Sequence, residues 1–127
     1  SEDIVHHLGD VFFGPRSFFE QQWPRLNGKK KLIVGNHDDV RYLASLDRSK
    51  FFYDVALEKR LGTNLYLTHV PIHPSGLITP RKSWVNVHGH IHTNSSPNGP
   101  YINVCVEVRD YAPVSLEDLE VEARKLI

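Results

Sequence analysis

The hydrophobic pattern consists of short apolar runs separated by polar stretches that contain glycine or proline. Runs of this length predict buried or half-buried strands. They lie at residues 4–8, 32–34, 51–58, 65–69, 84–88 and 101–108. In the last run every second residue from Ile102 to Val108 is apolar, which is the period of a strand with one buried face. A turn around Gly62 and Asn64 is expected to join the third run to the fourth.

Helices are predicted between the early strands and at the end of the chain. Ser17 and Glu20 occupy capping-box positions, and the helix that they begin should end near Trp23 because the next residue is proline. Residues 39–46 predict a second, short helix. Ser115 begins a terminal helix and has an acidic residue three positions later. Strands therefore alternate with helices early and dominate later, which predicts a layered α/β domain with mixed sheets.

Three stretches are predicted to lie outside strands and helices. Residues 71–83 are interrupted by prolines and a glycine, and residues 94–100 are rich in Asn, Ser, Pro and Gly. The consecutive lysines Lys29–Lys31 predict a solvated turn ahead of the second strand.

Composition indicates one domain over residues 1–127, because a chain of this length can bury a single substantial core. Fifteen basic residues balance fifteen acidic ones, so net charge gives no attraction to nucleic acid or membranes. No apolar stretch approaches the roughly 20 residues of a membrane span, and no secretory signal is visible. Cys105, the single cysteine, excludes an intrachain disulfide and is expected to be a small core residue. These features predict a cytoplasmic protein and leave its oligomeric state open.

Aspartate, asparagine and histidine residues lie at or after the ends of four of the predicted strands. Gly9-Asp10 follows the first and Gly35-Asn36-His37-Asp38 the second, while His69 and Gly89-His90-Ile91-His92 end or follow two later ones. Carboxylate and amide oxygens with imidazole nitrogens, and no thiolate, suit borderline divalent metals at a hydrolytic centre. A carboxylate can bridge two cations, and neutral imidazoles add affinity without adding charge. Two histidines two positions apart can face the same side of an extended segment.

In this order and at these spacings, the four elements resemble the signature of the calcineurin-like metallophosphoesterases. The resemblance covers nearly the whole chain, and residues 103–108 and 111–116 are similar to the small single-domain bacterial and phage members. It implies an αββα sandwich of two mixed sheets flanked by helices. It also implies hydrolysis of a phosphate mono- or diester by a water activated between two metal ions. The substrate would be a small phosphate ester or a nucleotide.

The resemblance also implies a role for each polar residue. Asp10 would bridge two ions, His92 would bind the first, and the second would be completed by Asn36, His69 and His90. Mn, Fe, Ni or Zn would suit these ligands. His37 would stabilise or protonate the leaving oxygen, and Asp38 would orient it.

One family element is missing, because no Asp-x-His precedes Asp10. Methionine is absent as well, including at the first position. We therefore expect an N-terminally shortened phosphoesterase that lacks the first strand and helix. Only Asp10 and His92 would then serve the first ion, so a single bound ion is an alternative to two. A catalytically impaired protein-binding module and a nucleic-acid-processing phosphodiesterase are the alternative functions.

The remaining aromatic, histidine and arginine residues are predicted to have supporting functions. Phe12 and Phe13 are expected in the core or in a cleft wall, and no individual arginine is assigned to phosphate binding. Packing or support is expected for His6, His7, His73 and His88.

Overall fold

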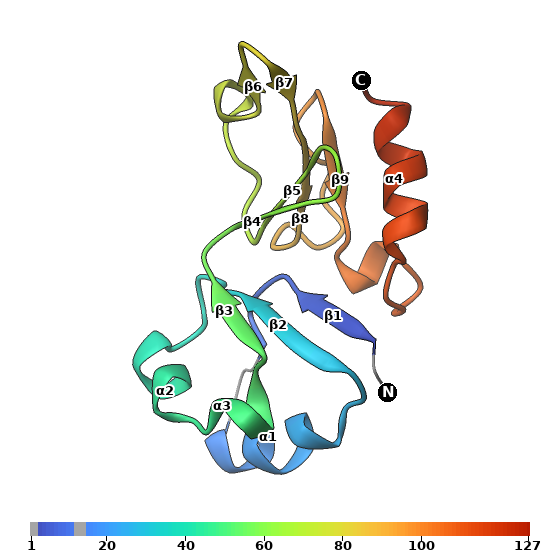
Figure 1. Ribbon diagram of the computed structural model, residues 1–127. Helices are drawn as coiled ribbons and strands as arrows, with labels where there is room; N and C mark the ends of the chain where they lie inside the picture. The colour runs from blue at the N-terminus through green and yellow to red at the C-terminus, as the bar shows by residue number, and fades with distance from the viewer. Residues whose placement is uncertain (1–2, 12–14) are drawn as a thin grey trace. The chain divides into compact units, whose positions relative to one another are not determined.

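The computed structural model describes residues 3–11 and 15–127, so the prediction for Phe12 and Phe13 lies outside the described residues. The chain divides into two compact units, Ser1–Leu57 and Glu58–Ile127. Each contains its own sheet, and the chain is a mixed α/β protein, as predicted (Figure 1). Within the described ranges, no helix has the length and apolar character needed to cross a membrane.

The N-terminal unit is built on a parallel three-stranded sheet with strand order β1-β2-β3. Its strands are β1 (Ile4–His7), β2 (Lys29–Ile33) and β3 (Asp54–Ala56). Its helical elements are α1 (Arg16–Gln22), the 3-10 turn η1 (Trp23–Arg25), α2 (Val40–Ser45) and α3 (Arg48–Phe51).

Aromatic side chains from these helices form the core of the N-terminal unit. Phe19 stacks on Trp23 with ring centroids 5.4 Å apart and on Phe51 at 5.7 Å. The Trp23 indole N–H donates to the Phe51 carbonyl at 2.7 Å, which satisfies its polar atom inside the core. Leu32 of β2 and Leu43 of α2 complete the same cluster. The helices therefore pack on the sheet through one apolar face.

Two predicted boundaries in this unit are wrong. Helix α1 begins at Arg16 with Pro15 as its N-cap, and no side chain caps it, so the Ser17 capping box does not form. Pro15 already has the φ of −64° that a helix entry needs. The predicted strand 51–58 is shorter, because Phe51 ends helix α3 and only 54–56 pair with β2.

The lysine run is also not a turn, because Lys29–Lys31 are the first residues of β2. Lys30 is buried, and its ammonium donates to the carbonyls of Trp23 at 3.0 Å and Leu26 at 2.8 Å. The Leu26 carbonyl directly follows the η1 turn, and the Trp23 carbonyl also accepts from the Leu26 N–H at 3.1 Å. Burial lowers the pKa of Lys30.

The C-terminal unit contains a mixed four-stranded sheet with strand order β4-β5-β8-β9. Its strands are β4 (Lys59–Leu61), β5 (Leu65–Thr68), β8 (Val85–His88) and β9 (Tyr101–Asn103). Strands β5, β8 and β9 are parallel, and β4 joins β5 antiparallel through the predicted turn, in which Gly62 has φ 62°. The other elements are η2 (Pro74–Gly76), the two-stranded β6 (Ile78–Thr79) and β7 (Lys82–Ser83), η3 (Val106–Val108) and α4 (Leu116–Arg124).

Both central strands, β5 and β8, are buried along their whole length. Two buried residues of β8 are polar, Asn86 and His88. The Asn86 amide is fully hydrogen-bonded: it donates to the Tyr66 carbonyl and the Thr68 hydroxyl, each at 2.9 Å. Its Oδ1 accepts from the Ile72 N–H at 2.9 Å. This amide fixes the chain that leaves β5.

The end of the C-terminal unit differs from the prediction in one strand and confirms the last helix. Strand β9 ends at Asn103, so the strand expected to continue to Val108 is too long. Val106 and Val108 are exposed in a 3-10 turn instead of sharing a buried face. Ser115 caps α4 as expected, its hydroxyl accepting from the Asp118 N–H at 3.1 Å.

Candidate functional site

Two of the predicted ligand motifs directly follow neighbouring parallel strands of the N-terminal unit. Gly9-Asp10 follows β1 and Gly35–Asp38 follows β2. Carboxyl ends of parallel strands lie at the same edge of a sheet, which is where open α/β sheets bind ligands. The sheet topology therefore brings the Asp10 and Gly35–Asp38 loops together within this unit.

The Gly-Asn-His-Asp motif forms a tight turn. The Asp38 N–H donates to the Gly35 carbonyl at 3.2 Å, which closes a four-residue turn. Asn36 and His37 occupy its two central positions and are exposed, whereas Gly35 and Asp38 are buried. The motif thus consists of two buried anchoring residues and two polar residues presented at the surface of the unit.

Asp38 anchors this turn to the neighbouring loop. Its Oδ2 accepts from the N–H groups of Gly35 at 2.8 Å and Asp10 at 2.9 Å. Its Oδ1 accepts from the Val11 N–H at 2.9 Å. Three backbone donors therefore hold the Asp38 carboxylate. Its predicted orientation of the His37 ring stays a prediction.

Asp10 lies directly against the turn. Its Oδ1 accepts from the His37 N–H at 2.9 Å. A Cβ atom at Gly35 would overlap both the Asp10 backbone nitrogen and its carboxylate, so this position requires glycine because of close approach. The close approach of Asp10 therefore explains why the motif has glycine at position 35.

In the C-terminal unit, the predicted histidines lie at the carboxyl ends of β5 and β8. The Gly89 N–H donates to the His69 carbonyl at 2.9 Å, which joins the two strand ends. The side chain of His69 is buried, and its Nε2 lies 3.2 Å from Nδ1 of His90. The two rings meet edge to face with centroids 5.0 Å apart.

This nitrogen separation fits two ligands of one cation. Two nitrogens bound at about 2.1 Å are separated by about 3.0 Å in octahedral and about 3.4 Å in tetrahedral geometry. The 3.2 Å between His69 and His90 lies between these values. The spacing of the pair therefore suits two nitrogen ligands of one cation.

Three of the predicted ligands have left-handed backbone conformations. Asp10 has φ 55°, His90 φ 71° and His92 φ 52°. Such angles are uncommon for residues with a side chain, and they concentrate at functional positions where surrounding contacts enforce them. Asp110 and Tyr111 are the other residues other than glycine with positive φ in the described ranges.

His92 contacts a residue that the sequence did not indicate. Its Nδ1 lies 2.5 Å from Oε2 of Glu107, which follows β9 in the η3 turn. The hydrogen bond with His92 lowers the pKa of Glu107. The sequence pattern placed Glu107 in a strand, so nothing in it pointed to a contact with the Gly-His-x-His loop.

The supporting functions expected for two other histidines, His88 and His7, are confirmed by their contacts. His88 is fully buried between the Ser96 hydroxyl, 2.9 Å from its Nε2, and the Gly89 carbonyl, 3.0 Å from its Nδ1. Burial lowers its pKa. His7 packs against Trp23 with ring centroids 5.4 Å apart.

Cys105 was expected to be a small core residue, but it is only partly buried and lies after the end of β9; burial raises the pKa of its thiol.

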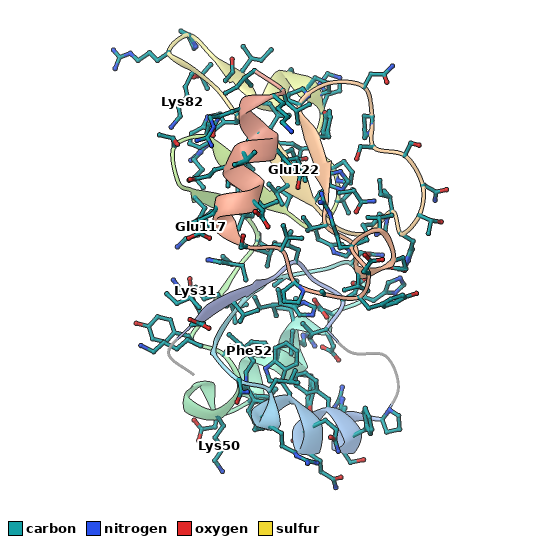
Figure 2. All side chains as sticks on the ribbon, turned by 90° about the vertical axis from the view of Figure 1, so that its right-hand side faces the viewer. Lys31, Lys50, Phe52, Lys82, Glu117 and Glu122 are labelled. Carbon is teal, nitrogen blue, oxygen red and sulfur yellow. The ribbon has the colours of Figure 1, made fainter. Side chains whose placement is uncertain are left out.

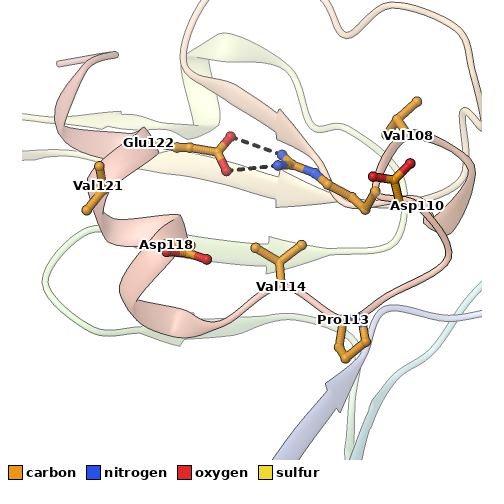
Figure 3. A pocket seen from close by; sticks show the side chains of 8 residues that line it. Val108, Asp110, Pro113, Val114, Asp118, Val121 and Glu122 are labelled. Carbon is orange, nitrogen blue, oxygen red and sulfur yellow. Dashed lines mark hydrogen bonds and ion pairs between the residues drawn. The ribbon is translucent and has the colours of Figure 1, made fainter.

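A pocket of the C-terminal unit lies beside α4 and contains none of the predicted ligands (Figure 3). The Arg109 guanidinium binds both carboxylate oxygens of Glu122, at 2.9 and 3.0 Å. It also donates through Nε to the Asn103 carbonyl at 3.1 Å. The pocket wall is therefore an ion pair that fastens α4 to the end of β9. Its lining comprises Val108, Arg109, Asp110, Pro113, Val114, Asp118, Val121 and Glu122.

The chain resembles proteins whose activity is not defined. No family model matches it. It is 31% identical over 125 residues to the uncharacterized protein MJ1445 of Methanocaldococcus jannaschii, and the match covers 91% of this chain and 63% of that relative's length. It also resembles the crystal structure of AQ665 from Aquifex aeolicus, a protein of unknown function. That comparison has a TM-score of 0.64 and 27% identity, and covers 98% of this chain and 76% of that one.

Proposed function

We propose that the chain is a metal-dependent phosphoesterase of the calcineurin-like type, acting on a phosphate mono- or diester. The observation that carries the proposal is the 3.2 Å separation of the His69 and His90 nitrogens at the carboxyl ends of parallel strands. A second set of polar residues, Asp10 and the Asn36-His37 turn, leaves the equivalent ends of β1 and β2.

The proposal assigns Asp10, Asn36, His69 and His90 to one divalent ion. A second ion would use Asp10 and His92. Asp10 suits both because a carboxylate has two oxygens, and its exposed neighbour Asn36 offers an amide oxygen. The resemblance implies that these ligands lie in an αββα sandwich. Mn, Fe, Ni and Zn all suit this donor set.

The chain's own residues would position the ester and move a proton. Divalent ions, when bound, supply Lewis-acid activation of water and of the phosphoryl group. His37 is the proposed general acid at the leaving oxygen, because imidazole titrates near neutral pH and this one is exposed at the turn. We propose that Asp38 orients His37 by fixing the turn, since its carboxylate accepts from three backbone N–H groups.

The substrate class that fits best is a small phosphate ester or a nucleotide. The balanced charge of the chain, with fifteen basic and fifteen acidic residues, does not favour extensive contact with a nucleic-acid backbone.

Hydrolysis of p-nitrophenyl phosphate and bis(p-nitrophenyl) phosphate with added Mn²⁺ tests the proposal. We expect turnover that requires the metal, and a fall in kcat of about 100-fold or more in His37→Ala with Mn²⁺ binding retained. Asp10→Asn should lose both metal binding and turnover. Asp110→Asn is the matched control, because Asp110 is exposed and shares the left-handed backbone, with φ 53°. A wild-type chain without metal-dependent turnover, or a fully active His37→Ala variant, would contradict the proposal.

A further inference from the structure

The segment that follows β9 holds the Gly-His-x-His loop at several points. The Val104 N–H donates to the His88 carbonyl at 2.9 Å, where the loop begins. The Asn103 side-chain amide donates to the His92 carbonyl at 2.9 Å, where the loop ends. Its other atom, Oδ1, accepts from the Cys105 N–H at 2.8 Å, which fixes the orientation of the amide. The backbone of the loop is thus held at both ends.

This segment is itself supported from α4. Arg109 connects the Asn103 carbonyl to the carboxylate of Glu122 on that helix (Figure 3). Glu122 projects from the same helix as Glu117 (Figure 2). The segment that contacts the Gly-His-x-His loop is therefore itself held in place by the Arg109–Glu122 ion pair.

The ring of His92 is held by a carboxylate. Its side chain is 74% exposed, and its Nδ1 lies 2.5 Å from Oε2 of Glu107, whose side chain is 29% exposed. A carboxylate only accepts hydrogen bonds, so the proton between these atoms belongs to Nδ1. In the neutral ring the lone pair then lies on Nε2.

We propose that Glu107 is a positioning residue that holds neutral His92 as the Nδ1–H tautomer, with Nε2 as its ligand atom. This inference rests on the proposed function, because His92 is one of the proposed ligands. It goes beyond it by assigning a function to Glu107 and a specific ring nitrogen to His92.

The neighbouring histidine shows the opposite arrangement. His90 directs Nδ1 toward Nε2 of His69, so Nδ1 is the nitrogen that it would offer to an ion. Two histidines two positions apart would therefore bind through different ring nitrogens. Carboxylates that hold the second nitrogen of a histidine ligand typically contribute 10- to 100-fold to metal affinity.

Nitrogen-15 chemical shifts of the imidazole rings in metal-free protein at about pH 8 test the tautomer directly, since histidine is neutral there. The wild-type chain should show His92 protonated on Nδ1. Glu107→Ala should shift His92 toward the Nε2–H form that an unrestrained ring favours. Glu107→Gln keeps an acceptor oxygen and should lie between the two. Glu117→Ala, on the exposed face of α4, should leave His92 unchanged.

Calorimetric titration of the same variants with Mn²⁺ is the second readout. Glu107→Ala should weaken binding of the ion served by His92 by about 10- to 100-fold, and Glu117→Ala should not. An Nε2–H tautomer in the wild-type chain, or no change of tautomer in Glu107→Ala, would overturn the inference. A wild-type chain with the expected tautomer that binds no Mn²⁺ would instead contradict the proposed metal centre, because the tautomer is measured without metal.

Discussion

Asp38 and Asp39 are adjacent aspartates with different functions. Asp38 is buried and accepts from three backbone N–H groups of the Asp10 and Gly35 loops. Asp39 is exposed and caps α2, accepting from the Tyr42 N–H at 3.1 Å and pairing with Arg16 at 2.9 Å. One Asp therefore organises the candidate site, and the next one begins a helix.

Replacing Asp38 by asparagine should destabilise the N-terminal unit by about 3 kcal/mol, because an amide turns one acceptor into a donor that faces backbone N–H groups. Urea unfolding of the metal-free chain measures this change. Asp39→Asn is the matched control, since asparagine caps helices as well as aspartate does, and it should change stability little. Equal losses of unfolding free energy in the two variants would show that the three hydrogen bonds to Asp38 add no stability beyond that of the Asp39 cap.

The cap of α2 should depend on pH. The Tyr42 N–H and then the Arg16 charge lower the pKa of Asp39 below its ordinary value of 3.8. Because the folded-state pKa is the lower one, the stabilisation is complete above 3.8 and is lost as pH falls through the folded-state value. Urea midpoints measured from about pH 5 downward should therefore fall less steeply in Asp39→Asn than in the wild-type chain. Parallel curves would contradict this assignment.

At the level of elements, the sequence predicts the short strands well, although only the two central strands of the C-terminal unit are buried throughout and Ile4 and Val5 of β1 are exposed. Strands β1, β2, β5 and β8 were all expected from short apolar runs, and β5 and β8 are buried throughout. The predicted ligands lie in or next to the loops that follow these strands. Within each sheet, parallel strands end at the same edge, so these loops are neighbours there. The pairing of His69 with His90 follows from that topology and from their spacing along the chain.

Elements decided by distant contacts could not be predicted. Alternation of apolar residues in 101–108 indicated one long strand, but the Asn103 side chain binds His92 and Cys105, and the strand ends there. Glu107 consequently lies in a 3-10 turn, which the alternating pattern concealed. Lys30 was likewise expected in solvent. It is buried because its ammonium donates to carbonyls in and directly after η1, and the sequence pattern gave no sign of this contact.

Strand β2 should depend on the Lys30 ammonium. Lys30→Met would keep the apolar stem but remove the ammonium donor from the Leu26 carbonyl and one of two donors from the Trp23 carbonyl, at a cost of about 2 kcal/mol. Chemical unfolding measures the loss. Lys31→Met, at the next strand position, should cost clearly less, because Lys31 is only partly buried and contacts the Tyr53 ring. A stable Lys30→Met variant would show that these hydrogen bonds add little.

For the whole molecule, the two units each contain part of the proposed ligand set. The N-terminal unit carries Asp10 and Asn36, and the C-terminal unit carries three histidines, His69, His90 and His92. We propose that Asp10, Asn36, His69 and His90 bind one divalent ion, and this is the proposal on which the function rests.

Calorimetric titration of metal-free protein with Mn²⁺ tests this claim most directly. We expect Asp10→Asn and His90→Ala each to weaken the tightest Mn²⁺ binding by about 100-fold or more, whereas Asp110→Asn should bind like the wild-type chain. Wild-type affinity in Asp10→Asn, together with lost binding in His90→Ala, would confine the ion to the C-terminal unit and contradict the account.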